Sequence, residues 1–496
     1  MGKPNILVIM TDQQRFDSLG CYGCSFVKTT NLDQLAAQGV RYENCYVNNP
    51  VCTPSRASIL TGKHINGHGV FQLHDILPEN EPLYTVKLKE KGYQTALIGK
   101  LHVSGRSFER DERNKNDGFD IYKYAMTPHN VEGKYNSYGS WLQENHPEFY
   151  AELVEKGRKV GNIPAECHFT YWAAEETIDF IENRRSNGPF FCMMSVVDPH
   201  DPYSDYPVEA LSGIDKDMIP RAAAEKDEAH RKSAAVERAH NHSYLGGYHN
   251  YTPNEIRQMQ IGYYASIAFL DQQVGRVLDA LDREGLKENT LVVFLSDHGD
   301  MLGDHELFAK GPFFYDPSVK VPFMMRFPGV VPEGTVVEQL VQPHDLGATF
   351  LSLAGYAERE TDALMPGLVN LLSALKEENM YRDYAVCLYR NTSISDEKIY
   401  FDPPIHATML RTEAWKLTVY HHPNRAVNPA DGELYDMISD PGETMNLWDN
   451  PEHSAVRQEL ISRMMNWLVS SDVMYHSGRG GVMFPPKAQW SMNNPL

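Results

Sequence analysis

Cys52 stands in a short stretch, Cys52-Thr53-Pro54-Ser55-Arg56, that combines a nucleophile, a helix-starting residue and a fixed positive charge. Proline is common in the first turn of a helix, so we expect a helix to open near Pro54. Cys52 would then lie just outside the helix N-terminus, where backbone N–H groups attract anions. Arg56 would lie one turn in, able to reach the same anion. These residues alone leave two interpretations open: a buried structural cysteine, or a reactive thiolate.

Acidic residues follow three apolar runs that we expect to be strands. In open α/β sheets, ligands bind beyond the carboxyl ends of the strands, so acids placed there converge on one crevice. A single aspartate in such a place is more often a turn or a helix cap, and we interpret Asp198 in this way. The runs and their acids are Ile6–Met10 with Asp12, Phe190–Val197 with Asp198, and Thr290–Ser296 with Asp297.

Two of these acids have a second potential ligand beside them, in the pairs Asp12-Gln13 and Asp297-His298. A set that consists mostly of oxygen donors suits a hard divalent cation such as Ca²⁺ or Mg²⁺. One histidine nitrogen in the set would also allow Mn²⁺. The two pairs therefore predict one divalent cation at the end of the sheet.

The segments that must position these residues alternate between helical and strand patterns along most of the chain. Helix followed by strand, repeated in this way, predicts a mostly parallel sheet with helices on both faces. The expected helices cover residues 31–39, with Asn31 as the cap, 83–92, 171–185 and 254–285, and a further strand covers 93–99.

The pattern changes near residue 380, where short strands follow one another without long helices between them. Strands are expected at 385–389, 408–411 and 415–420, and a helix at 454–470. This order predicts a smaller antiparallel sheet with a C-terminal helix packed on it. We therefore expect a catalytic α/β domain over residues 1–375 and a smaller α+β subdomain with a tail over 376–496.

Two segments carry no regular pattern. The polar stretch 202–251 lies between an expected strand and the long helix, and its place directly after Asp198-Pro199-His200 favours a lid over a site. The tail from Tyr475 is rich in Gly, Pro and polar residues, which is compatible with a wrapping arm and with a homo-oligomer.

The formal charge of −20, from 46 basic and 66 acidic residues, argues against binding to nucleic acid, which requires a basic surface. No stretch approaches the roughly 20 apolar residues that span a bilayer, and the first apolar run is too short for a signal peptide. We therefore expect a soluble, cytoplasmic protein that binds neither nucleic acid nor membrane. The seven cysteines are an odd number in a long chain, which predicts no disulfide framework.

The stretch that begins at Cys52 resembles the signature of the type I sulfatases. In that family a formylglycine-generating enzyme, here a transient partner, converts the cysteine to formylglycine, an aldehyde. The resemblance implies the alkaline-phosphatase-like α/β sandwich fold, in agreement with the large parallel sheet expected above. The residues that carry the signature are Cys52, Pro54, Ser55, Arg56, Leu60, Thr61 and Gly62.

Further motifs of the same family follow in order along most of the chain. They are Asn5–Asp12, Gly99–His102, Asp198–His200, Ser296–Gly299, Phe308–Gly311 and, in the C-terminal subdomain, Glu433–Leu447. The resemblance implies a metal site formed by Asp12, Gln13, residue 52, Asp297 and His298, with Ca²⁺ as the first choice and Mn²⁺ or Mg²⁺ as alternatives. It also implies a catalytic set formed by Cys52, Arg56, Lys100, His102, His200 and Lys310.

The implied reaction uses residue 52 as a hydrated aldehyde, which has two hydroxyl groups on one carbon. One hydroxyl attacks sulfur in line and forms a covalent sulfated hemiacetal. The other then loses its proton, sulfate leaves and the aldehyde returns. The implied roles are these: Arg56 orients the diol, Lys100 binds the diol and the sulfate, His102 is the base, and His200 and Lys310 bind the sulfate and neutralise or protonate the leaving oxygen.

Three functions stay open at this point. The first is hydrolysis of an aryl, alkyl or carbohydrate sulfate ester, a small-molecule substrate. The second is hydrolysis of a phosphonate monoester or phosphodiester with the same nucleophile, because Gln13 and His298 depart from the commoner family residues and suit the phosphonate monoester hydrolase and iduronate-sulfatase-like branches. The third is a catalytically silent metal-binding homologue in which Cys52 stays a thiol.

Overall fold

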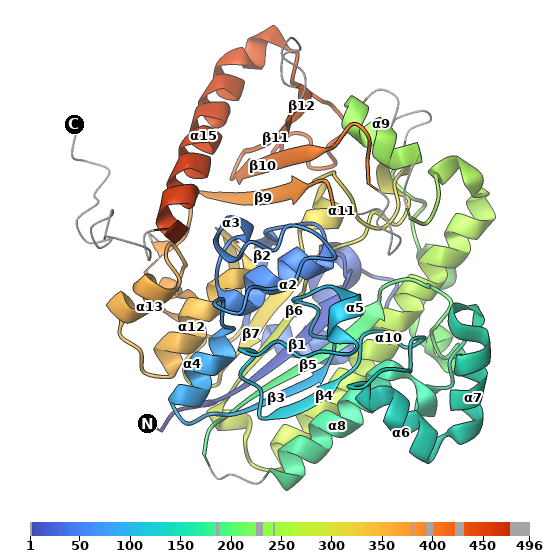
Figure 1. The fold of residues 1–496 in the computed structure, drawn as a ribbon. Helices are drawn as coiled ribbons and strands as arrows, with labels where there is room; N and C mark the ends of the chain where they lie inside the picture. Colours follow the sequence, from blue (N-terminus) through green and yellow to red (C-terminus); the bar gives the residue numbers. More distant parts are fainter. Residues whose placement is uncertain are drawn as a thin grey trace.

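The computed structural model describes residues 2–184, 188–224, 232–241, 244–377, 380–392, 400–421 and 431–476. A large sheet and a small sheet form the framework (Figure 1). The tail from Tyr475 falls almost entirely outside the described residues, so its interpretation as a wrapping arm stays a prediction. Within the described part of the chain, none of the helices combines the length and the apolar character that crossing a membrane requires.

The large sheet has eight strands, and seven of them run parallel. The exception is β7, which is antiparallel to both of its neighbours. In spatial order the strands are β4 (Ile121–Tyr124), β3 (Gln94–Gly99), β5 (Phe190–Pro199), β1 (Asn5–Asp12), β6 (Thr290–Ser296), β7 (Phe323–Arg326), β2 (Val40–Cys45) and β8 (Thr335–Val341). The expected mostly parallel sheet is therefore confirmed.

Both faces of the large sheet are buried, because successive side chains of a strand point to opposite faces. In β1, Ile6 and Val8 belong to one apolar core and Leu7 and Ile9 to the other. The first core lies against α2 (Cys52–Thr61), α4 (Tyr84–Glu90) and α12 (Leu346–Leu353), and the second against α1 (Thr30–Ala37), α8 (Phe169–Asn183) and α10 (Pro253–Arg283).

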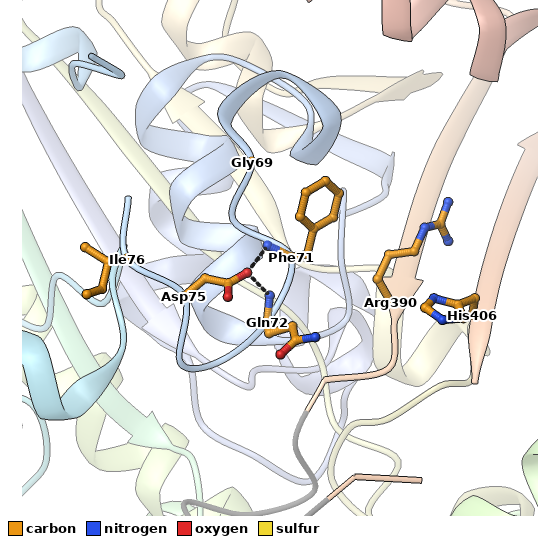
Figure 2. Close-up of a pocket in the computed structure, with 7 residues that line it drawn as sticks. All are labelled: Gly69, Phe71, Gln72, Asp75, Ile76, Arg390 and His406. Carbon is orange, nitrogen blue, oxygen red and sulfur yellow. Dashed lines mark hydrogen bonds between the residues drawn. The ribbon is translucent and has the colours of Figure 1, made fainter. Parts of the chain in front are cut away.

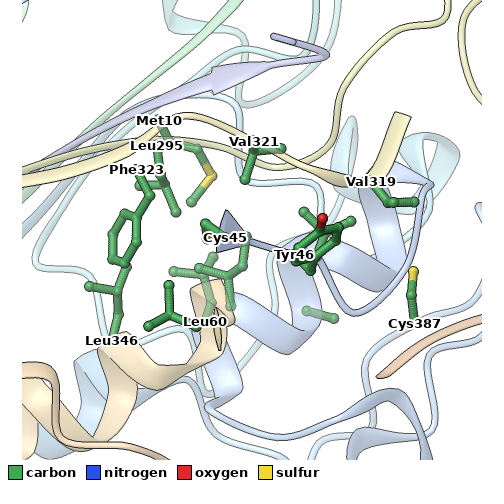
Figure 3. Close-up of a cluster of buried hydrophobic side chains, with 14 of the residues drawn as sticks. Met10, Cys45, Tyr46, Leu60, Leu295, Val319, Val321, Phe323, Leu346 and Cys387 are labelled. Atoms are coloured by element: carbon green, nitrogen blue, oxygen red, sulfur yellow. The ribbon is translucent and has the colours of Figure 1, made fainter. Parts of the chain in front are cut away.

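Figure 3 shows part of the first core, where the sheet residues Met10, Leu295 and Phe323 face Leu60 of α2 and Leu346 of α12. All five side chains have no solvent-exposed surface. Full burial of such a side chain contributes about 1.5–3 kcal/mol to folding. This packing holds α2, and with it Cys52, against the sheet.

A helix begins where its capping residues predict, unless a residue from a distant part of the chain binds the capping side chain. The expected helix 254–285 is confirmed as α10, which opens with Thr252 and Glu255 in a capping box and Pro253 in the first turn. The expected cap at Asn31 is wrong. Helix α1 begins one residue earlier, and the side chain of Asn31 donates instead to the Asp271 carboxylate on α10, at 2.9 Å.

The small sheet has four antiparallel strands in the order β12 (Asp431–Asp436), β11 (Trp415–His421), β10 (His406–Thr412) and β9 (Tyr384–Arg390). Helix α15 (Ser454–His476) packs on it through Leu460 and Met464. The predicted antiparallel sheet with a C-terminal helix is confirmed. All four strands lie beyond residue 376, while the domain limits 1–375 and 376–496 stay a prediction.

Shorter helices complete the described chain and mostly lie outside the sheets. They are α3 (Ile65–His68), α5 (Arg106–Glu109), α6 (Ser137–Asn145), α7 (Pro147–Lys156), α9 (Ala234–Asn241), α11 (Asp316–Val319), α13 (Glu358–Leu364) and α14 (Leu371–Ala374). Helix α9 and several single turns form the described parts of the polar stretch 202–251.

Candidate active site

The three central strands of the large sheet bring the predicted acids together. Strand β1 lies between β5 and β6, and Asp12 pairs with Pro199 across to β5. The carboxyl ends of parallel strands meet at one edge of a sheet, so Asp12, His200 and the pair Asp297-His298 converge there. Asp12 and Asp297 both bind Arg56 there, whereas Asp198 accepts a hydrogen bond from Thr170 of α8, in agreement with its interpretation as a structural residue.

Cys52 is the first residue of α2, and Val51 before it is extended. The expectation that Cys52 lies just outside the helix is therefore wrong by one position, because Pro54 occupies the third helical position and not the first. A proline is tolerated there because the N–H groups of the first turn have no partner within the helix. Only 3% of Cys52 is exposed.

Arg56 lies one turn into α2, fully buried, and binds two of the predicted metal ligands, Asp12 and Asp297. Its Nε donates to Asp297 Oδ2 at 2.5 Å, and its Nη2 donates to Asp12 Oδ2 at 3.3 Å. Its Nη1 donates to Ser195 Oγ on β5 at 2.9 Å. Arg56 thus fixes the two carboxylates in place, a role that differs from the implied orientation of the diol.

Lys100 and His102 follow β3, as their motif predicts. Lys100 pairs with Asp12 Oδ2. Burial alone would raise the pKa of Asp12, but Lys100, His200 and Arg56 outweigh it and hold the pKa well below its usual range. Asp12 is therefore a carboxylate at neutral pH.

His102 has a left-handed backbone, with φ at 55°, which a non-glycine residue rarely adopts. Its Nε2 lies 3.0 Å from Thr53 Oγ1, and among the described residues its Nδ1 has no hydrogen-bond partner. Burial, with Lys100 and Arg56 nearby, holds the pKa of His102 well below its usual value. The imidazole is therefore neutral and has the form that a base requires.

Lys310 and His200 contact each other across the site. Lys310 Nζ lies 2.9 Å from His200 Nε2 and 2.8 Å from Gln13 Oε1. An ammonium group only donates, so His200 Nε2 accepts, and His200 Nδ1 carries the proton that it donates to the Asp201 carbonyl at 2.8 Å. Burial and Lys310 lower the pKa of His200 to about 4, in agreement with a neutral ring.

Gln13 lies beside the metal-site acids with a left-handed backbone, φ 67°. Its backbone N–H donates to Asp297 Oδ1 at 3.1 Å, and its side-chain N–H donates to Asp300 Oδ2 at 2.7 Å. Its amide oxygen accepts from Lys310. The role of Gln13 as a metal ligand stays a prediction.

Two buried atoms in this cluster lack hydrogen-bond partners within the described residues, Asp12 Oδ1 and His298 Nε2. Together with Cys52 Sγ they lie within 4.8 Å of one another. His298 Nδ1 lies 2.9 Å from the Gly299 carbonyl, which orients the ring and leaves Nε2 as the ligand atom. An unpaired carboxylate oxygen and an unpaired imidazole nitrogen that face one point fit a divalent cation.

A pocket of about 440 Å³ opens above this cluster. Five predicted catalytic residues line it: Cys52, Lys100, His102, His200 and Lys310. The sixth, Arg56, is absent from the lining, as are the other four predicted metal ligands, Asp12, Gln13, Asp297 and His298. His74, Arg106 and Arg158 also line the pocket. Basic side chains thus gather around the site of a chain whose net charge is −20, so the local charge suits an anion.

Three residues that sequence reasoning missed take part in the site. Asp201 accepts from Tyr244 Oη at 2.5 Å and lies 3.1 Å from His200 Nδ1. Asp300 holds the side chain of Gln13. Glu109 accepts from three backbone N–H groups of the loop that carries His102. Asp201 directly follows His200 and Asp300 lies two residues after His298, so adjacency to the motifs was the available signal.

The structure also describes the state of the cysteines and the position of the predicted lid. All seven cysteines are free, so the expectation of no disulfide framework is confirmed. Pro202 and Tyr244, from the two ends of the polar stretch 202–251, line the pocket. This position over the pocket agrees with a lid.

The fold and the site together define a hydrolase of the alkaline phosphatase superfamily. The family model for sulfatases matches residues 4–356, and the model for the C-terminal part of N-sulphoglucosamine sulphohydrolase matches residues 303–469. The chain belongs to the sulfatase family, and it is a sulfuric ester hydrolase by class.

Individual relatives agree with this family. An arylsulfatase of Clostridium perfringens is 33% identical over 408 residues, which cover 77% of this chain and 80% of the relative. An N-acetylglucosamine-6-O-sulfatase of Bacteroides thetaiotaomicron is 25% identical, and the match covers 92% of this chain and 85% of the relative's chain. The solved structure of a phosphonate monoester hydrolase from Silicibacter pomeroyi has the same fold, with a TM-score of 0.79. The match covers 95% of this chain and 96% of the hydrolase chain, at 22% sequence identity.

Proposed function

We propose that this enzyme hydrolyses a sulfate ester of an aryl, alkyl or carbohydrate alcohol, with a formylglycine at position 52 as the nucleophile. The observation that carries the proposal is the position of Cys52 Sγ at the floor of the pocket, within 4.8 Å of the unpaired Asp12 Oδ1 and His298 Nε2. A nucleophile in this position would be close to a cation held by these two atoms, and Lys100 and Lys310 line the same pocket.

One divalent cation, with Ca²⁺ as the first choice and Mn²⁺ or Mg²⁺ as alternatives, is proposed for the cluster. Asp12, Asp297 and His298 would hold it, together with Gln13 and residue 52. When bound, the ion supplies positive charge that stabilises the developing charge on the sulfate oxygens and on the nucleophile. The mostly oxygen donor set supports a hard cation.

Two lysine side chains would bind the sulfate group. Lys310 and Lys100 line the pocket beside Cys52, and they outweigh the effect of burial to lower the pKa of its thiol. The same two charges favour any anionic oxygen at position 52 and the oxygens of a bound sulfate. Arg56 would hold the carboxylates of Asp12 and Asp297 in place through its hydrogen bonds to both.

Two neutral histidines would take part in the proton transfers. His102, with its unpaired Nδ1, is proposed as the base that takes a proton from the second hydroxyl of the hydrated aldehyde. His200, bonded to Lys310, is proposed to neutralise the leaving oxygen with the ammonium proton of that pair. In the first step the attacking hydroxyl would release its proton to solvent and its oxygen would bond to sulfur as the sulfur–oxygen bond to the leaving alcohol breaks. In the second step the other hydroxyl would give its proton to His102 and become the aldehyde carbonyl as the bond from the carbon of residue 52 to the sulfate oxygen breaks. Addition of water would then restore the diol.

The test is a peptide mass across residues 42–56 combined with activity on 4-nitrophenyl sulfate. We expect an aldehyde at residue 52 in active protein from the native host, and loss of activity in Cys52→Ala. An active preparation with an unmodified thiol would contradict the nucleophile. An aldehyde-bearing protein that hydrolyses no sulfate ester would contradict the reaction. A protein that keeps the thiol and hydrolyses nothing would support the silent homologue.

Removal of the cation gives an independent check. Dialysis against a chelator is expected to abolish hydrolysis and to lower the melting temperature, because Asp12 Oδ1 and His298 Nε2 then lose their ligand and the native state loses a bound ion. Re-addition of Ca²⁺, Mn²⁺ or Mg²⁺ singly identifies the ion by the recovery of both properties. Unchanged activity after complete metal removal would exclude the proposed site.

A phosphonate monoester or phosphodiester hydrolase is the second candidate. Two observations favour it: the pair of Gln13 and His298, and the phosphonate monoester hydrolase among the similar folds. Rates on a sulfate monoester and on a phosphonate monoester with the same leaving group separate the two candidates. A dominant phosphonate activity would replace the sulfatase proposal.

A further inference from the structure

Asp300 is a buried acid that the proposed mechanism does not use. It lies two positions after His298, in the loop that follows β6, and has no solvent-exposed surface. Its carboxylate accepts from the Gln13 side-chain N–H at 2.7 Å, from Tyr203 Oη at 2.7 Å and from the Leu302 backbone N–H at 2.8 Å. Burial raises the pKa of Asp300, and these three donors oppose the shift because they favour the charged form.

The side-chain amide of Gln13 is held between an acid and a base. Its Nε2 donates to Asp300 Oδ2, and its Oε1 accepts from Lys310 Nζ at 2.8 Å. An ionised carboxylate only accepts and an ammonium group only donates, so neither partner tolerates the amide in the flipped orientation. The amide oxygen therefore faces Lys310, which lines the active-site pocket, and the amide nitrogen faces Asp300.

The main chain of Gln13 is fixed as well. Its N–H donates to Asp297 Oδ1 at 3.1 Å, and its carbonyl accepts from Tyr263 Oη at 2.8 Å. Its backbone is left-handed, with φ at 67°. With the main chain held in this way, the two side-chain partners of Gln13 decide which atom of its amide faces the site.

We propose that Asp300 is the positioning residue that makes an amide oxygen, and not a second carboxylate, the ligand that position 13 offers to the cation. This inference rests on the proposed cation site and names a residue behind it. A carboxylate at position 13 would face the Asp300 carboxylate with no donor between them, and like charges at that distance repel. An amide avoids this repulsion because it presents an oxygen on one side and a donor on the other.

Asp300→Asn tests this role at nearly constant size. Asparagine offers one acceptor and one donor where the carboxylate offers two acceptors. The arrangement that keeps an oxygen for the Leu302 N–H, and lets Tyr203 Oη accept, turns the new N–H₂ group toward Gln13. Two donors then meet, and the Gln13 amide must flip and turn its own nitrogen toward Lys310 and the cation.

The experiment is a calorimetric titration of the chelator-treated full chain with Ca²⁺ and with Mn²⁺, which measures affinity without turnover. We expect Asp300→Asn to weaken binding by about 10-fold to 100-fold, the usual effect of removing a residue that orients a metal ligand. Asp300→Ser, a smaller change that brings no amide donor, is the second variant, and it is expected to weaken binding because the Gln13 amide loses its fixed partner. Thermal unfolding checks that each variant is folded.

A pair of exchanged residues separates positioning from a general structural role. Gln13→Glu alone is expected to bind the cation no more tightly than the wild type. Gln13→Glu combined with Asp300→Asn is expected to bind about tenfold more tightly than Asp300→Asn alone, because the new N–H₂ group then donates to the new carboxylate. A residue that only stabilised the fold would give no such recovery.

Asp75→Asn is the matched control. Figure 2 shows its carboxylate bonded to the backbone N–H groups of Phe71 and Gln72, at 2.8 and 2.9 Å, within its own loop. The same substitution there is expected to leave the cation affinity at the wild-type value.

Wild-type affinity in both Asp300 variants, or no recovery in the combined variant, would overturn the proposal. A wild-type protein that binds neither cation would overturn the cation site and this inference with it. Hydrolysis of 4-nitrophenyl sulfate by the wild type tests the sulfatase function separately.

Discussion

Asp201 links three side chains at the edge of the active-site pocket. Its carboxylate accepts from Tyr244, binds Arg158 at 2.6 Å and lies 3.1 Å from His200 Nδ1. Burial would raise the pKa of Asp201, but His200 and Arg158 outweigh it and lower the pKa below its usual value. The fixed negative charge keeps the proton of His200 on Nδ1 and so leaves Nε2 facing Lys310.

We expect Asp201→Asn to lower kcat/KM for a sulfate ester by about 10-fold to 100-fold, or about 1.4–2.7 kcal/mol. An amide has no charge and can turn a donor toward His200, so the ring loses its fixed orientation. Steady-state kinetics with 4-nitrophenyl sulfate measures the effect. The exposed Asp111→Asn, outside the pocket, is the control and should be silent. Wild-type kinetics in a folded Asp201→Asn protein would show that His200 does not depend on this acid.

Glu109 acts on the site through the backbone. Its buried carboxylate accepts from the N–H groups of His102 at 2.7 Å and of Val103 and Ser104 at 2.9 Å. Consecutive N–H groups that point at one anion stabilise the left-handed turn that His102 adopts. Burial nevertheless dominates and raises the pKa of Glu109 from 4.5 to about 7.

This raised pKa predicts a pH dependence of stability. Between the pKa of the unfolded chain and about pH 7, the folded protein binds more protons, so the contribution of Glu109 to the free energy of unfolding falls as pH rises. Glu109→Gln cannot ionise and is expected to lack this slope, which amounts to about 1.4 kcal/mol for each unit of pKa shift. Urea unfolding of both proteins from about pH 5 to about pH 8 measures the difference. Parallel curves would contradict the assignment.

At the scale of elements, helix α2 connects the active-site residues to the hydrophobic core. Its first turn carries Cys52, Arg56 follows one turn in, and Leu60 near its end is fully buried in the core on one face of the sheet. The helix ends at Gly62, whose φ of 64° is the left-handed conformation that glycine adopts without strain. The position of the nucleophile therefore depends on packing about two turns away.

Leu60→Ala is expected to lower the free energy of unfolding by about 2–5 kcal/mol, because it removes a buried side chain and leaves a cavity. Denaturant unfolding measures this loss. Val208→Ala, at a side chain that is 57% exposed, provides a control that should change stability by less than about 0.5 kcal/mol. Equal effects of the two changes would mean that α2 is not held by this core.

At the scale of the whole molecule, a buried ionic cluster joins the small sheet to the large domain. Lys416 of β11, 1% exposed, binds Glu443 at 2.8 Å and Asp316 of α11. Burial would raise the pKa of Asp316, but Lys416 and its basic neighbours lower it to about 2. The cluster fixes the small sheet against α11.

Lys416→Met is expected to destabilise the protein by about 3–5 kcal/mol near neutral pH, because two buried carboxylates lose their cation. The loss should shrink as pH falls toward about 3, where the carboxylates of the variant take up protons. Unfolding experiments at both pH values measure this change. Lys320→Met, which removes a longer 3.9 Å contact to Asp316, is the control and should cost less. A loss that does not vary with pH would argue against the ionic origin.

The elements could be predicted from the sequence wherever a local pattern decides them. The apolar run of β1 and the apolar stripe of α10 are each visible in the local sequence, so their types agree with the structure and their limits agree to within two residues. The start of α1 was misjudged because the distant Asp271 takes the side chain of Asn31. The start of α2 was misjudged because the extended Val51 places Cys52 inside the first turn.

The sequence by itself determined which residues could do chemistry, since residue type and motif spacing are local properties. Cys52 with its motif, the strand-terminal acids and the lysine–histidine pair were all visible there. Only the tertiary structure decided what these residues touch. Arg56 binds an acid 241 positions away, and Lys310 contacts His200, 110 positions away. Such contacts exist only when the sheets are assembled, because burial and charge pairing depend on distance in space and not on distance along the chain.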